Sequence, residues 1–180
     1  MLDLDRKVND LKLLISETQI QEKSKELAHK LDSMFNPDEK LYLICVLKGS
    51  IMFYSELVKH LKHDIQMEFI RLSSYGNNFK SSENIKTLDL NLPDLTNQNI
   101  VIVEDIIDTG ITAKFLIEMF KTNYKPKKLV FLPMLNKKTA RKTDIEPDLF
   151  GFEIDDKFVV GYGLDYKGFF RNLPYIAYFS

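Results

Sequence analysis

Three acidic residues stand close together at the end of one apolar segment, and small hydroxyl residues follow them at once. After the apolar run 100–103, the polar residues in order are Glu104, Asp105, Asp108, Thr109 and Thr112, with Gly110 between the threonines. Carboxylates accept hydrogen bonds from a sugar diol and ligate Mg²⁺. A glycine–threonine turn that opens a helix offers backbone N–H groups and hydroxyls to a phosphate. The stretch therefore predicts a ligand with a phosphate on one side and hydroxyl groups or a metal ion on the other, such as a sugar phosphate.

Two other interpretations of this stretch compete with that one. In the first, Asp108 only caps the helix and the other two acids are solvated; this accounts for any one acid better than for three beside a Thr-Gly-x-Thr turn. In the second, the acids form a Mg²⁺-dependent phosphatase or receiver site. Such a site needs a nucleophilic aspartate after a strand near the chain start, and the sequence offers none there.

Alternating strands and helices must position these groups. Continuous apolar runs predict strands, and apolar residues at helical spacing predict helices. The predicted strands are 40–47, 65–71, 99–105 and 127–135, and the predicted helices are 16–35, 49–63 and 109–123. This alternation indicates an α/β fold with a twisted, mainly parallel sheet flanked by helices. Ligands of such sheets bind beyond the carboxyl ends of the strands, where Glu104 and Asp105 stand.

The rest of the chain predicts a smaller lobe within the same domain. Short strands are expected at 149–154, 158–163 and 174–179. We expect one domain over 1–180, with a core at about 36–148 and a hood made by the N-terminal segment and 149–180. The polar segment 73–86 directly follows a buried strand, so it predicts either a mobile functional lid or a simple surface loop.

Composition narrows the class of protein. The chain has 180 residues, with Lys+Arg 25 against Asp+Glu 26 and a net charge of −1. This balance argues against a broad nucleic-acid or membrane surface. The single cysteine, Cys45, excludes an internal disulfide and fits a reducing compartment. No signal-peptide pattern or long apolar run is present, so a cytoplasmic protein is expected.

The run VIVEDIIDTGIT (101–112) resembles the 5-phosphoribosyl 1-pyrophosphate (PRPP) binding motif of the type I phosphoribosyltransferases, in the form of their 6-oxopurine branch. Further similar stretches, in the family's order, are LKGS (47–50), SSY (73–75), LNKKTAR (135–141), LFGFEIDDKFVVGYGLDY (149–166) and FFRNLP (169–174). The resemblance implies the family's fold with its hood and lid. It also implies transfer of the phosphoribosyl group of PRPP to hypoxanthine or guanine, which gives IMP or GMP and pyrophosphate and requires Mg²⁺.

The resemblance also implies a role for each group of site residues. The catalytic base would be Asp108. The PRPP phosphate and ribose would be bound by Glu104, Asp105, Asp108, Thr109, Gly110, Ile111 and Thr112. Pyrophosphate would be bound by Lys48, Gly49 and Arg171, with a cis peptide before Lys48. The purine site would include Lys137, Phe158, Val159 and Asp165. The metal would be held by Glu104, Asp105 and Asp165, and the lid would carry Ser74 and Tyr75.

One departure and several alternatives follow from the resemblance. Ile111 stands where many relatives carry lysine, so the phosphate turn has one cation fewer. A regulator with the same fold that binds nucleic acid would be expected to add a basic face, which the charge balance does not favour. Lys137 argues against adenine and uracil as substrates, whereas xanthine stays open as an additional one. The expected partners are small-molecule substrates, with no nucleic acid and no membrane, and the family suggests a homodimer or homotetramer.

Overall fold

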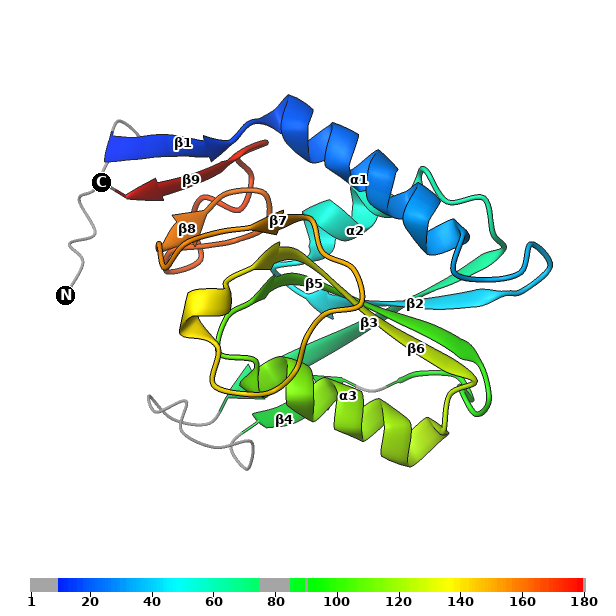
Figure 1. Ribbon diagram of the computed structural model, residues 1–180. Helices are drawn as coiled ribbons and strands as arrows, with labels where there is room; N and C mark the ends of the chain where they lie inside the picture. The colour runs from blue at the N-terminus through cyan, green and yellow to red at the C-terminus, as the bar shows by residue number, and fades with distance from the viewer. Residues whose placement is uncertain (1–9, 75–84, 90, 180) are drawn as a thin grey trace.

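The computed structural model describes residues 10–74, 85–89 and 91–179, and a six-stranded sheet lies at its centre (Figure 1). The spatial order of the strands is β4-β3-β2-β5-β6-β7. Their bounds are β2 (Leu41–Leu47), β3 (Ile65–Ser74), β4 (Ile85–Asp89), β5 (Asn99–Ile107), β6 (Lys128–Asn136) and β7 (Phe152–Glu153). All neighbouring pairs are parallel except β3 and β4. The predicted α/β fold with a mainly parallel sheet is confirmed.

Helices cover both faces of this sheet, as Figure 1 shows: α1 (Glu17–Asp32) and α2 (Ile51–Val58) lie on one side and α3 (Ile111–Tyr124) on the other. Side chains alternate along β5 because successive residues of a strand point to opposite faces. Val101 and Val103 belong to the apolar cluster on the α1 and α2 side, and Ile100 and Ile102 to the cluster on the α3 side. Burial on both faces explains why these strands read as continuous apolar runs.

The start of α1 follows from its local sequence, whereas the bounds of α2 differ from the prediction. Helix α1 begins with a capping box, in which the Gln19 N–H donates to Ser16 Oγ and the Ser16 N–H donates to Gln19 Oε1. Helix α2 is shorter than the predicted 49–63. It begins only at Ile51, because 48–50 form a turn, and its end is tightened by a bond from the His60 N–H to Leu57 O.

A second, three-stranded antiparallel sheet forms the hood over the carboxyl ends of the main strands (Figure 1). Its order is β1-β9-β8, with β1 (Leu11–Ile15), β9 (Ile176–Phe179) and β8 (Val159–Val160). Strand β7 instead extends the main sheet by pairing with β6. Across the described ranges, no helix is long and apolar enough to cross a membrane.

The predicted lid segment is described only at its edges. Ser74 is the last residue of β3, and the segment's end forms part of β4, which pairs with β3. A strand at 85–89 was not predicted, because its sequence IKTLD has no distinctive pattern and its pairing is made by the backbone. Tyr75 lies outside the described residues, so the lid stays a prediction.

A histidine–aspartate pair that joins α1 to the turn after α2 predicts a pH-dependent stability. His63 Nδ1 lies 2.7 Å from Asp32 Oδ1, and this hydrogen bond raises the pKa of His63 above its ordinary 6.5. A raised pKa in the folded state stabilises the fold fully below pH 6.5, and this contribution is lost as the pH rises through the folded-state pKa. We expect the urea midpoint of the wild type to fall between pH 6 and pH 8.5 by more than that of H63Q. H29Q, which replaces an exposed histidine of the same helix pair, should behave like the wild type; equal pH dependence in H63Q and the wild type would contradict the assignment.

Candidate active site

A cavity of about 600 Å³ opens where β2 and β5 end beneath the hood. Four segments meet there: the turn after β2, the end of β5, the start of α3 and the hood loop that carries Asp165 and Arg171. The predicted site residues that line it are Lys48, Gly49, Glu104, Asp105, Asp108, Thr109, Gly110, Thr112, Asp165 and Arg171. The structure therefore brings together in one cavity the residues predicted for PRPP and pyrophosphate.

The turn between β5 and α3 has the geometry of an anion site. Gly110 is the N-cap of α3 and has a φ of 82°, which favours glycine. The N-cap Gly110 has no side chain to cap the helix, and the Ile111 N–H has only a 3.4 Å contact with Thr109 Oγ1. The first-turn N–H groups have no intrahelical partner, and the positive end of the helix dipole lies beside the cavity. Asp108 is therefore not a helix cap, and the first alternative interpretation of the acidic stretch is wrong.

Of the two adjacent carboxylates at the end of β5, Glu104 is buried and Asp105 is partly exposed to the cavity. Glu104 is 8% exposed, and burial raises the pKa of its carboxyl group well above the usual range, with the charge of Asp105 adding to the effect. Burial also raises the pKa of Asp105 to about 6, although the Ile106 N–H donates to its Oδ1 at 2.7 Å. Such a pair favours a ligand that brings hydrogen-bond donors or positive charge.

The turn after β2 packs between these carboxylates and the hood without any intervening side chain. A Cβ atom on Gly49 would lie 1.5 Å from Asp105 Oδ2, and a Cβ on Gly163 would lie 1.9 Å from Gly49 O. The peptide between Leu47 and Lys48 is cis, as the resemblance implied. These two distances show that glycine is needed at both positions for the turn to pack this closely against Asp105 and against the hood.

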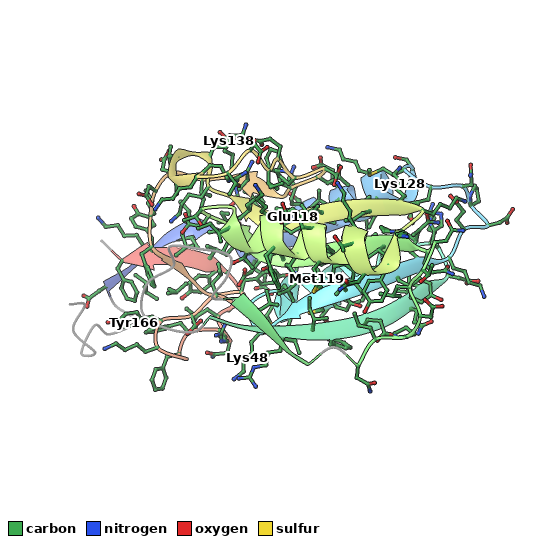
Figure 2. The ribbon with its side chains drawn as sticks, turned by 90° about the horizontal axis from the view of Figure 1, so that it is seen from below. Lys48, Glu118, Met119, Lys128, Lys138 and Tyr166 are labelled. Atoms are coloured by element: carbon green, nitrogen blue, oxygen red, sulfur yellow. The ribbon has the colours of Figure 1, made fainter. Side chains whose placement is uncertain are left out.

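The hood supplies a cation beside a carboxylate on the far wall of the cavity. Arg171 Nη2 lies 2.5 Å from Asp165 Oδ1, and Arg171 Nη1 donates to Gly163 O. The Gly168 N–H donates to the other carboxylate oxygen of Asp165 at 2.6 Å. Lys48 is exposed at the rim, where Figure 2 shows it on the same side of the molecule as the hood residue Tyr166.

Lys137 does not line the cavity itself, but its ammonium group lies beside Asp108, which does. Its side chain is 9% exposed, and its Nζ lies 3.7 Å from Asp108 Oδ2 and 3.1 Å from Asp156 Oδ1. Asp156 was not predicted as a site residue. The only signal in the sequence was its place beside Phe158 in the run DDKF, which gives no direction for its side chain.

Phe158 presents an aromatic face at the hood. It is 51% exposed, and its ring stacks on Phe179 with centroids 6.3 Å apart and an interplanar angle of 28°. The Tyr166 ring meets it edge-on at 5.9 Å. Val159 is buried and pairs with Tyr178 in the hood sheet. Phe179 was also missed, because its contact with Phe158 joins the end of β9 to the residue before β8, and an irregular loop separates the two in the sequence.

The sequence and the structure of this chain are similar to those of known proteins. A sequence profile of the phosphoribosyl transferase domain matches residues 16–167. The hypoxanthine-guanine phosphoribosyltransferase of Bacillus subtilis (strain 168) is 44% identical over 166 residues, covering 92% of this chain and 91% of that protein. The protein of that name from Aquifex aeolicus (strain VF5) is 41% identical over 165 residues, covering 91% and 92% respectively. A crystal structure of a hypoxanthine-guanine phosphoribosyltransferase from Bacillus anthracis has a TM-score of 0.89 at 43% identity, covering 94% of this chain and 98% of that one.

Proposed function

The chain belongs to the phosphoribosyltransferase family, and we propose that it is a purine-salvage enzyme that converts hypoxanthine or guanine and PRPP to IMP or GMP and pyrophosphate. Two relatives named for this activity align with most of its length. The observation that carries the proposal is one cavity in which an anion-binding turn, a partly buried carboxylate pair and a cation beside a carboxylate meet, with Lys137 next to Asp108 at its edge. The turn offers donors to a phosphate, the carboxylate pair offers acceptors to a ribose, and Arg171 offers a positive charge to a pyrophosphate. Lys137, at the edge, offers a donor to a purine.

The PRPP half of the site binds two anions with a diol between them. The turn Asp108 to Thr112 receives the 5′-phosphate through its backbone N–H groups and threonine hydroxyls. Glu104 and Asp105 accept hydrogen bonds from the ribose hydroxyls, which supply the donors that buried carboxylates need. Lys48, the Gly49 backbone and Arg171 bind the pyrophosphate, and the cations offset its charge.

The purine half of the site selects and activates the base. Lys137 donates to the purine O6 and so favours a 6-oxo group over a 6-amino group, which is itself a donor. Asp108, 3.7 Å from the same ammonium, accepts the proton of N7 as N9 forms its bond to C1′ and the bond from C1′ to pyrophosphate breaks. Phe158 stacks on the ring and the Val159 backbone contacts position 2. Ser74 and Tyr75 belong to the lid that excludes water from the reacting C1′.

Mg²⁺ fits the carboxylates of this site as a partly substrate-held ion. Mg²⁺ prefers oxygen ligands and commonly takes one or two carboxylates together with substrate phosphates. Asp105 and Asp165 line the same cavity with Glu104. Among the described residues no group of three or more ligating side chains is preassembled around a point, which matches an ion that arrives with PRPP. The ion would neutralise charge on the departing pyrophosphate.

A spectrophotometric assay with PRPP and Mg²⁺ tests the function. We expect turnover with hypoxanthine and guanine and none with adenine, because Lys137 cannot accept from an amino group. The xanthine reaction decides whether that base is an additional substrate. Absence of turnover with all three 6-oxopurines would refute the proposal, and it is the result expected of a nucleic-acid-binding regulator with the same fold.

The proposal extends to the location and assembly of the enzyme. A cytoplasmic location is supported by Cys45, a free and buried thiol, and cell fractionation would test it. Assembly into a homodimer or homotetramer is supported by the family and by two exposed apolar side chains on one face of β3, Met67 and Phe69, which are 44% and 43% exposed. Light scattering on the purified protein would test the assembly.

A further inference from the structure

We infer that Arg141 is a positioning residue for the phosphate turn: it fixes the direction of the turn's peptide groups and supplies the positive charge that the turn itself lacks. This inference deepens the proposed function and rests on it, because it concerns the turn assigned to the 5′-phosphate. Arg141 does not line the cavity, and neither the resemblance nor the chemistry of the sequence gave it a role.

The guanidinium of Arg141 joins three separate segments through three hydrogen bonds. Its Nε donates to the carbonyl oxygen of Asp108 at 3.1 Å, within the phosphate turn. Its Nη2 donates to Asn136 Oδ1 at 2.6 Å, at the fully buried end of β6. Its Nη1 donates to the carbonyl oxygen of Ile145 in the following loop. The rigid fork of arginine makes such a three-way contact directional.

The next residue extends this contact along the turn. The Lys142 N–H donates to the carbonyl oxygen of Thr109 at 2.9 Å, so two consecutive carbonyls of the turn face the segment 141–143. The same segment occupies the space beside Gly110, where a Cβ atom would lie 2.1 Å from Thr143 Oγ1 and 2.8 Å from Arg141 Cδ. Gly110 is therefore required by this packing as well as by its φ.

These carbonyl contacts determine where the N–H groups point. In a trans peptide the C=O and the following N–H lie on opposite sides of the chain. Because the carbonyls of Asp108 and Thr109 face Arg141 and Lys142, the N–H groups of Thr109 and Gly110 face the other way, and both residues line the cavity. Successive N–H groups with a common direction form an anion-binding concavity. Arg141, on the side of the turn away from the cavity, therefore orients the N–H groups that would donate to the phosphate.

The charge of Arg141 is free to act on a bound anion. Its three partners are neutral, and within the described part of the chain no carboxylate forms an ion pair with it. The turn 108–112 contains no lysine or arginine, since Ile111 stands at the position where a cation would be expected from the resemblance. A cation that lies directly behind the turn compensates for that absence.

Binding of two small ligands to the full chain tests the inference. Isothermal titration with ribose 5-phosphate reports on the phosphate turn, and titration with pyrophosphate and Mg²⁺ reports on the opposite half of the cavity. We expect R141M to weaken ribose 5-phosphate binding by roughly 10- to 100-fold, the range for hydrogen bonds to charged groups, and to leave pyrophosphate binding within about threefold. R141K retains the charge but not the fork, so its loss should be smaller than that of R141M.

The matched control is K138M. Lys138 belongs to the same segment, in the short helix η3 (Lys138–Ala140), but its Nζ pairs with Glu153 at 3.1 Å. Figure 2 shows it on the opposite side of α3 from Lys48. K138M removes one positive charge nearby and should bind ribose 5-phosphate like the wild type.

Two results would overturn the inference. One is wild-type affinity of R141M for ribose 5-phosphate; the other is an equal loss of ribose 5-phosphate and pyrophosphate binding in both R141M and R141K, which would indicate a general structural role. Failure of the proposed function is separate from both: it shows as missing wild-type turnover with every 6-oxopurine, whereas these titrations need no purine.

Discussion

Replacing Asp108 with asparagine is expected to lower kcat by about 100-fold or more, while the Kd for PRPP changes by less than about threefold. The carboxylate of Asp108 lies 3.7 Å from Lys137 Nζ, on the purine side of the turn, whereas its carbonyl oxygen faces Arg141 on the other side. The substitution removes the proposed proton acceptor and leaves in place the backbone that we propose binds the phosphate. Rapid-quench kinetics with hypoxanthine, combined with titration of PRPP, separates the two effects.

The control for this prediction is D156N. Asp156 Oδ1 lies 3.1 Å from the same ammonium, but its side chain is 74% exposed and it does not line the cavity. D156N therefore removes a carboxylate from Lys137 without removing the proposed base, and we expect a much smaller loss of kcat than in D108N. Equal losses of PRPP binding and kcat in D108N would refute the general-base role.

Replacing Gly49 with alanine is expected to reduce kcat/KM for PRPP by about 100-fold or more, since misplacement of a substrate by about 1 Å has effects of that size. An added Cβ would lie 1.5 Å from Asp105 Oδ2 and 2.5 Å from its Cγ, so the carboxylate must leave its position. The φ of Gly49 is not among the positive values in the described chain, so alanine adds a methyl group without backbone strain. Steady-state kinetics at varied PRPP measures the loss.

A double-mutant cycle identifies the cause of that loss. If the methyl group acts by displacing the Asp105 carboxylate, then G49A should cost far less in a D105A background than in the wild type. The same loss in both backgrounds would show that the added methyl disturbs the turn itself, and it would contradict displacement of the carboxylate as the cause.

The sequence predicted best those features that are local. The strand β5, the turn at 108–110 and helix α3 follow one another along the chain, so periodicity and residue type were enough to place them. Glu104 and Asp105 could be assigned to the open end of the sheet because parallel strands all end at the same edge. The sequence placed Asp108 in the turn but could not show that its two polar groups face different neighbours. In the structure its carbonyl oxygen accepts from Arg141, whereas its carboxylate lies beside Lys137.

The features that sequence could not predict depend on contacts across the fold. Strand β1 is ordered by pairing with β9, more than 150 residues later in the chain, which no local pattern reveals. Phe179 supports Phe158, and Asp156 reaches Lys137, only because the hood folds back over the sheet. Arg141 reads as an ordinary surface cation in the sequence, and its importance follows from three acceptors on three segments.

The contact of Gly163, Gly49 and Asp105 also limits how far the turn after β2 can shift relative to the hood. The hood and the turn after β2 meet main chain to main chain, because a Cβ atom on Gly163 would lie 1.9 Å from Gly49 O, whereas the end of β5 meets this turn through the Asp105 carboxylate. The turn that carries Lys48 is therefore held against the hood by backbone, which does not change rotamer, and against β5 by a single side chain.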